Sequence, residues 1–117
     1  MIFRKWSGRI RTADADEYVR YVEETGAAHY AATPGNLGYQ ILLRDLGDGI
    51  SEISTVSWWT DLDAVRRFAG GDYEVARYYP GDDRYLLTRP ETVEHHEVRG
   101  SSTPPHGSRL TGHTPPE

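Results

Sequence analysis

Apolar residues recur at every second position in Leu37–Leu46, and the segments Ile2–Ile10 and Ile50–Trp59 are likewise predicted as strands whose side chains divide between two faces. A period of two is typical of β-strands, because successive side chains point to opposite faces of a sheet. Gly47-Asp48-Gly49 separates Leu37–Leu46 from Ile50–Trp59 and is the short connection expected of a hairpin. The segment 84–99 is predicted to contain a last strand that is interrupted or edged at its proline.

Apolar residues follow a helical spacing after the first strand. Asp14 is a plausible N-cap, and Gly26 is a good stop. The segment 27–33 would add another turn or two, before the turn signal Pro34-Gly35-Asn36. The apolar positions of this predicted helix are Ala15, Tyr18, Val19 and Val22.

A second helical pattern follows the third strand, with Thr60 as its cap and Gly70-Gly71 as its end. Its apolar stripe consists of Leu62, Val65, Phe68 and Ala69. Asp72 is then in position to cap a second, short helix, which we expect over Tyr73–Tyr79 and which Pro80 and the residues after it would close.

The predicted order of elements is β-α-β-β-α(α)-β, which is the split βαβ or ferredoxin-like arrangement. The fold class is therefore α+β, with an antiparallel sheet whose helices cover one face. The strand Ile50–Trp59 has no purely polar face, so both faces are expected to be covered. A second copy of the chain is the simplest cover for the other face, and we expect a homodimer.

Composition limits the classes of function. A chain of 117 residues is one domain at most, which we assign to residues 1–99. Residues 100–117 are rich in Pro, Ser, Thr and Gly, and are predicted to be a disordered tail. The net charge is −5 and the basic residues are scattered, which argues against nucleic-acid and membrane partners. No apolar run has the length needed to span a bilayer or marks a signal peptide, and the expected location is the cytoplasm.

The absence of cysteine removes disulfides, thiolate metal sites and a thiol nucleophile. The pattern also shows no convincing metal site and no phosphate-binding glycine loop. We therefore expect no cofactor and no metal.

The order of motifs along residues 2–99 resembles the antibiotic biosynthesis monooxygenase family of dimeric α+β barrels. The segments that carry this resemblance are Ile2–Gly8, Asp16–Tyr18, Thr33–Asn36, Trp59, Phe68–Gly70, Ala76–Pro80, Asp82-Asp83 and Val93–Val98. The resemblance implies a homodimer of facing sheets, with one pocket per subunit between sheet and helices. Some relatives oxidise phenolic polyketide intermediates with O₂ and without flavin or metal. Others bind and cleave haem.

The haem-cleaving relatives place a Trp and a His on the helical region after the third strand. The corresponding positions here look like Phe68 and Arg77, and there is no histidine between Ala31 and Glu94. The resemblance therefore favours the other activities over haem degradation.

Four residues are candidates for catalysis: Trp59, Arg77, Tyr78 and His95. An imidazole titrates near neutral pH and suits a general base, so His95 is proposed for that role. Trp59, Arg77 and Tyr78 offer donors that would hold an oxyanion. The residues expected to line the pocket are Asn36, Phe68, Asp72 and Tyr79.

Each candidate also has a purely structural interpretation. Trp59 and Phe68 fit a packed core equally well, and Asp72 fits a helix cap. Asn36 follows Pro-Gly and suits a turn. His95 and His96 are adjacent on a strand and must face opposite sides, so they cannot both bind one metal.

Three functions remain open from the sequence. The first is a cofactor-independent monooxygenase that acts on a small aromatic or enolisable substrate with O₂. The second is a non-catalytic dimer that binds a small ligand, haem included. The third is a dimer whose pocket has been filled by its own side chains. The sequence leaves open whether the protein is an enzyme.

Overall fold

Four antiparallel strands form one sheet in the order β2-β3-β1-β4. The computed structural model describes residues 1–102. This strand order and the element order confirm the predicted ferredoxin-like α+β fold. The strands are β1 (Ile2–Arg11), β2 (Asn36–Gly47), β3 (Ile50–Trp59) and β4 (Glu94–Glu97).

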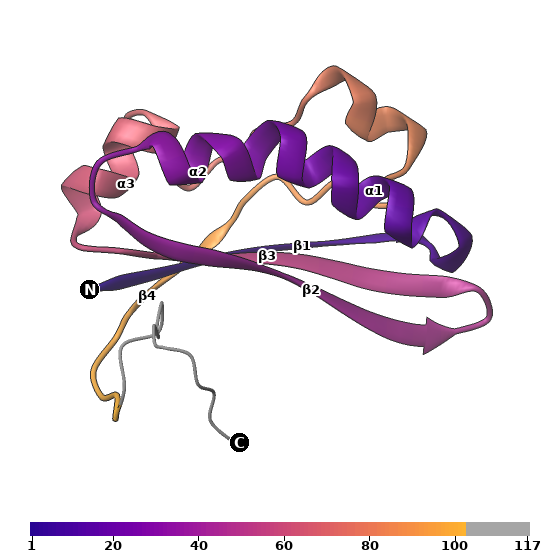
Figure 1. Cartoon of the computed structure of the whole chain (residues 1–117), viewed down its shortest axis with the longest axis horizontal. Coiled ribbons are helices and arrows are strands. Elements are labelled where there is room, and N and C mark those ends of the chain that lie inside the picture. The colour runs from indigo at the N-terminus through magenta and orange to yellow at the C-terminus, as the bar shows by residue number, and fades with distance from the viewer. Residues whose placement is uncertain (103–117) are drawn as a thin grey trace.

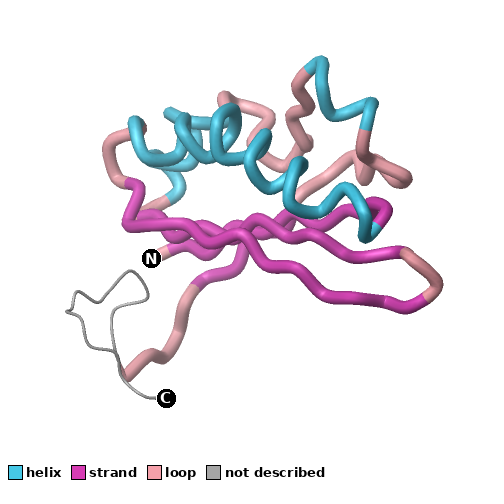
Figure 2. The backbone as a smooth tube through the Cα atoms, turned by 45° about the vertical axis from the view of Figure 1, so that its right-hand side comes forward, coloured by secondary structure: helices cyan, strands magenta, loops and turns pink. Residues whose placement is uncertain are grey.

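All the helices lie on one face of this sheet (Figure 1). The first two α-helices are joined through a π-helical segment and run as one rod across the strands, as Figure 2 also shows. The elements are η1 (Thr12–Asp14), α1 (Ala15–Val22), η2 (Glu23–Ala27), α2 (Ala28–Ala32), α3 (Leu62–Ala69) and η3 (Pro80–Arg84).

The pairing register decides which residues face the helices. Arg4 pairs with Ser57 on β3 and with His95 on β4, so these three residues share the face under the helices. Phe3 pairs with Trp58 and with His96 on the opposite face. Alternation along the strands was predicted from the sequence, but the neighbours across the sheet come only from the register.

Both predicted turns are confirmed by their backbone angles. Gly35 has φ +93°, and the amide of Asn36 donates to the carbonyl of Thr33, as a type II turn requires. Asp48 and Gly49 have φ +56° and +77°, the left-handed pair of a type I′ hairpin.

The helix boundaries differ from the prediction in three places. Gly26 does not end the first helix, because the chain continues through the π-helical η2 into α2. The N-cap of α3 is Asp61, whose carboxylate accepts from the amide of Ala64, rather than Thr60. Asp14 makes no side-chain cap hydrogen bond, since a 3₁₀ turn leads directly into α1.

The prediction of a short helix over Tyr73–Tyr79 is wrong. This segment is irregular and makes an antiparallel bridge between Val75 and Thr92. The amide of Ala76 donates to Glu91, and the amide of Val93 donates to the carbonyl of Glu74. Its backbone groups are thus satisfied by distant partners, which removes the need for the local hydrogen bonds of a helix.

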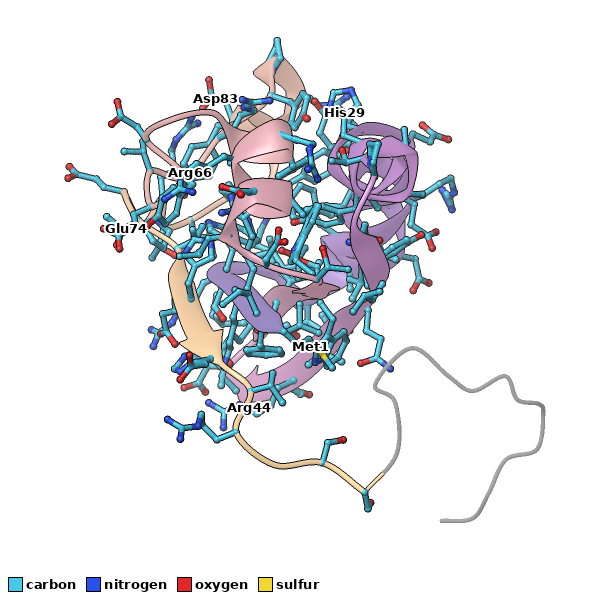
Figure 3. The ribbon with its side chains drawn as sticks, turned by 90° about the vertical axis from the view of Figure 1, so that its left-hand side faces the viewer. Met1, His29, Arg44, Arg66, Glu74 and Asp83 are labelled. Carbon is cyan, nitrogen blue, oxygen red and sulfur yellow. The ribbon has the colours of Figure 1, made fainter. Side chains whose placement is uncertain are left out.

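Two buried clusters fill the layer between helices and sheet, and Figure 3 shows how side chains occupy this layer. The first lies under α1 and contains Ile10, Ala15, Tyr18, Val22, Ile53 and Tyr85. The second lies under α2 and α3 and contains Ala27, Tyr30, Trp59, Ala64 and Val65.

No helix of residues 1–102 covers the sheet face opposite α1–α3 (Figure 1), and apolar side chains lie on this face. Phe3 contacts both Trp58 and His96, with ring centroids 5.3 and 5.9 Å apart. Leu42 is 47% exposed on this face of the β2–β3 hairpin.

Two expectations fall partly outside the structure. The predicted tail, 100–117, lies outside the described residues from position 103 onward. Within residues 1–102, no helix is long and apolar enough to cross a bilayer.

Replacing Gly35 by alanine is expected to destabilise the fold. A Cβ at this position would lie 2.5 Å from Cβ of Ala64, and φ is left-handed. We expect a loss of about 1–3 kcal/mol in unfolding free energy, measured by urea denaturation. Gly71→Ala is the control, because a Cβ there meets no atom within 4 Å; equal stability of the two variants would contradict this account.

Candidate functional site

A cavity of about 70 Å³ lies between the sheet and the helices, where the two core clusters meet. Its floor comes from β1 and β3 and its walls from the helices and from the irregular segment after α3. It is lined by Arg4, Trp6, Tyr18, Val22, Thr25, Gly26, Tyr30, Thr55, Phe68, Arg77, Tyr78, Tyr79, Asp82 and Val93. Aromatic rings and one buried cation therefore dominate its surface.

Arg4 is a buried charge on the cavity floor, with 5% of its surface exposed. Its Nη1 donates to the carbonyl of Tyr73 and to Nε2 of His95, both at 2.8 Å. Among residues 1–102 no carboxylate forms an ion pair with it. Burial lowers the pKa of Arg4, and the nearby Tyr30 opposes this in part. The guanidinium nevertheless stays charged, because the ordinary pKa of an arginine lies far above neutral pH.

A second guanidinium, that of Arg77, lines the outer part of the same cavity. Both cations contact the ring of Phe68, whose centroid lies 5.4 Å from Cζ of Arg4 and 5.9 Å from Cζ of Arg77. Arg77 is exposed, and the hydrogen bond that it donates to the carbonyl of Ala69 is long at 3.5 Å. Two positive groups thus lie against one aromatic wall.

His95 lies behind Arg4 rather than on the cavity wall. Because Arg4 donates to Nε2, the imidazole must be neutral and must carry its proton on Nδ1. Within the described chain Nδ1 is buried without a hydrogen-bond partner. Burial, helped by Arg4 and His96, lowers the pKa of His95 to about 4.

The two tyrosines of the irregular segment both line the cavity, with their hydroxyls already paired. The hydroxyl of Tyr78 accepts from Nε1 of Trp6 at 3.0 Å and donates to the carbonyl of Pro90. Tyr79 pairs with Nδ1 of His29 at 2.8 Å. Burial raises the pKa of Tyr78 and of Tyr79, so both stay protonated at neutral pH.

Asp82 is the acidic residue of the cavity, and it is held by the protein. It accepts from the hydroxyl of Tyr18 at 2.9 Å and from the amide of Tyr79 at 2.7 Å. Burial and this carboxylate raise the pKa of Tyr18. Asp82 therefore fixes the segment that closes the cavity, with each carboxylate oxygen already engaged.

The remaining predicted site residues lie away from the cavity. Trp59 is 0% exposed, and its Nε1 donates to Oγ of Ser57 at 2.9 Å. Its ring packs on Phe68, with centroids 5.5 Å apart. Asn36 bonds the carbonyl of Trp58 and the amide of Gly38, and Asp72 is exposed.

The structure thus brings together Phe68, Arg77, Tyr78 and Tyr79 of the predicted set. Arg4 and Trp6 share one face of β1, from which the sequence allowed either to reach the pocket, and the structure places both in the lining. Tyr18, Tyr30, Thr55 and Asp82 also enter the lining. The sequence pointed to Tyr18, Tyr30 and Thr55 only through the helical or strand period, which placed their side chains on inward faces.

Solved structures share this arrangement of elements. A candidate antibiotic biosynthesis monooxygenase from Caulobacter crescentus superposes with a TM-score of 0.57 at 18% identity, covering 85% of this chain and 90% of that one. A monooxygenase from the ActVA-Orf6 gene of Streptomyces coelicolor, in complex with nanaomycin D, has a TM-score of 0.54 at 16% identity, covering 88% and 91%.

This chain has the fold of the antibiotic biosynthesis monooxygenases. A variant of MhuD with two manganese protoporphyrin IX molecules per active site shares it too, with a TM-score of 0.57 at 18% identity over 88% of this chain and 99% of that one. No family model matches the sequence, and no curated protein matches it. The likeness therefore establishes the antibiotic biosynthesis monooxygenase fold and leaves the chemistry to the cavity.

The lining residues do not fit haem. They include no imidazole, thiol or thioether, and the hydroxyls of the four lining tyrosines are already hydrogen-bonded within the protein. The volume of about 70 Å³ is also well below the roughly 300–1,000 Å³ of sites for drug-sized ligands. Residues 1–102 contain no group of three or more His, Cys, Asp or Glu side chains placed to hold a metal ion.

The low pKa of His95 predicts an acid-sensitive contribution to stability. The unfolded chain takes up a proton near pH 6.5, while the folded chain does so only near pH 4. Between these values the unfolded state binds more protons, so the unfolding free energy falls as the pH falls. Urea unfolding at pH 7 and pH 4.5 should show a smaller difference for His95→Gln than for the natural chain.

The exposed neighbour His96 provides the control for this measurement. His96→Gln removes the exposed pair with Glu94 and keeps His95, so it should retain the part of the difference that comes from His95. A His95 resonance that titrates near pH 6.5 in NMR spectra of the folded protein would contradict the geometry.

Proposed function

We propose that the protein is a cofactor-independent monooxygenase that oxidises a small aromatic or enolisable substrate with O₂. The observation that carries this proposal is an aromatic cavity holding two guanidiniums with no carboxylate paired to them within residues 1–102. Electron-rich anions react with O₂ more readily than their neutral acids. A fixed cation in a site of low dielectric stabilises such anions strongly.

The reaction balances without an added reductant. The substrate arrives as an enolate or phenolate whose methylene proton has already passed to solvent, and this carbanion adds O₂ to form a peroxide anion. Protonation then gives a hydroperoxide, which eliminates water and leaves a carbonyl. One oxygen atom ends in the product and the other in water, while the substrate carbon supplies all four electrons.

The predicted residues take graded roles in this proposal. Arg77 and Phe68 touch the substrate, as do Tyr78 and Tyr79, which close one wall. Trp59 supports Phe68 from behind. We propose His95 as a positioning residue for Arg4 in place of the predicted general base, because its Nε2 is occupied and its pKa is about 4. Asn36 and Asp72 have no proposed catalytic role.

We also propose a homodimer formed through the uncovered sheet face. Phe3, Trp58 and Leu42 lie on this face and leave apolar surface that a second sheet would bury. The proposed location remains the cytoplasm.

A ligand-binding protein without catalysis is the alternative, and the cavity itself favours it equally. The ring of Trp59 contacts Phe68 as a filled pocket requires, yet a cavity remains beside Phe68. This remaining space favours a ligand over a purely structural role.

Oxygen uptake tests the proposed activity. A panel of one-ring phenols and small enolisable ketones, sized to the cavity of about 70 Å³, should contain compounds whose uptake depends on the protein. Arg77→Gln is expected to reduce kcat/KM by about 10–100-fold through loss of a charged hydrogen bond. Arg20→Gln makes the same charge change on the exposed face of α1 and should leave the rate unchanged.

Two results would count against catalysis. One is an absence of uptake across the panel by protein shown to be folded. The other is a rate that Arg77→Gln and Arg20→Gln leave equally unaffected. A Soret band that appears on haem titration and depends on His95 would instead support the haem-binding alternative.

Sedimentation equilibrium tests the dimer. The expected mass is twice the 13.2 kDa of one chain. Trp58→Asp places a charge on the uncovered face and should shift the protein to monomer. Leu87→Asp, at an exposed leucine outside the sheet, should remain dimeric. A natural chain that sediments as a monomer would refute the proposal.

A further inference from the structure

Polar and apolar groups lie side by side in the cavity. Arg4, Tyr30 and Thr55 form its polar part, where the hydroxyls of Tyr30 and Thr55 lie 3.2 Å apart. Phe68 and Val93 contribute apolar wall. A ligand would therefore place a polar group against Arg4 and a ring along the aromatic wall.

The guanidinium of Arg4 is only partly used by the protein. An arginine offers donors on Nε, Nη1 and Nη2. The two contacts with Tyr73 and His95 both come from Nη1. The donors on Nε and Nη2 remain for Tyr30, which lies nearby, and for a ligand in the cavity.

The partners of Arg4 are unusual for a buried cation. Charges this deeply buried are normally paired with an opposite charge, since removal from water costs several kcal/mol. Here the partners are a carbonyl and a neutral imidazole. The carboxylate of Asp82, which also lines the cavity, is engaged by Tyr18 and Tyr79. The charge is therefore available for an anion supplied from outside.

No lining residue is free to act as a general base. Asp82 accepts hydrogen bonds on both oxygens, and the tyrosines are protonated at neutral pH. His95 lies behind Arg4. The one free lone pair of its neutral imidazole, on Nε2, already accepts from Arg4. A ligand that binds as an anion must therefore arrive ionised.

We infer that Arg4, held in place by His95, forms an oxyanion subsite that selects aromatic acids already ionised at neutral pH, such as carboxylates or acidic phenols. This inference rests on the proposed function for the location of the site and deepens it by naming the substrate class. Arg77, at the outer end of the cavity, adds a second positive charge. His95 acts through Arg4 and does not itself touch the ligand.

The probe is 4-nitrophenol, whose ionised form has a visible band and whose single ring suits a small site. Titrations are run without oxygen over a range of pH, so that binding is measured apart from turnover. The phenolate should bind at least about tenfold more tightly than the phenol, as expected for a hydrogen bond to a charged group. The apparent pKa of the bound probe therefore falls, and 4-nitroanisole, which cannot ionise, should bind weakly.

Four variants assign the effect. Arg4→Gln should abolish the preference for phenolate, and Arg77→Gln should reduce it less. His95→Phe removes the acceptor and should weaken the preference severalfold, while His95→Gln keeps an acceptor and should restore much of it. Arg20→Gln, with the same charge change far from the cavity, should behave as the natural chain.

Equal binding of phenol and phenolate by the natural chain would overturn the inference, and so would a preference that survives in Arg4→Gln. If Arg4→Gln does not fold, the probe titration of the natural chain and the pair His95→Phe and His95→Gln still decide it. Phenolate selectivity without oxygen uptake on any substrate would support the subsite and refute the monooxygenase, so the two proposals fail separately.

Discussion

The hydrogen bonds of one arginine connect the parts that enclose the cavity. Arg4 extends from β1, donates to His95 on β4 and donates to the carbonyl of Tyr73 at the start of the irregular segment. The partners are 69 and 91 residues away in the sequence. This contact and the edge-on packing of Tyr73 against His95 fix the start of the segment that carries Arg77, Tyr78 and Tyr79.

The rest of the wall follows from that attachment. After Tyr73 the chain forms backbone hydrogen bonds with residues 91–93, so the two segments run antiparallel beside each other. Asp82 then holds the amide of Tyr79 and receives the hydroxyl of Tyr18 from α1. The cavity is consequently bounded by groups whose polar atoms are already satisfied, and only the guanidiniums carry unbalanced charge toward it. This asymmetry is what makes an anionic ligand the best match for the site.

The antibiotic biosynthesis monooxygenase fold determines the architecture of this protein, whereas the residues of the cavity determine which ligand fits. The fold provides a sheet with helices on one face and a second face that they leave uncovered. This chain shares that fold with structures to which its sequence identity is below 20%. One of those structures holds nanaomycin D and another holds metalloporphyrins, so the fold alone does not choose a ligand. In this chain the choice depends on cavity volume, on the absence of imidazole from the lining, and on Arg4.

Local sequence determined the strands, the turns and the helices under which the cavity forms. The period of two in β2, the left-handed positions at Gly35 and Gly49, and the apolar stripe of α3 are properties of neighbouring residues, so they could be predicted. Only the tertiary structure decided that Tyr73–Tyr79 is not a helix, that Arg4 is buried, and that His95 is a neutral acceptor. Each of these depends on hydrogen bonds between residues far apart in the chain, and the burial and charge that set a pKa exist only once those residues meet.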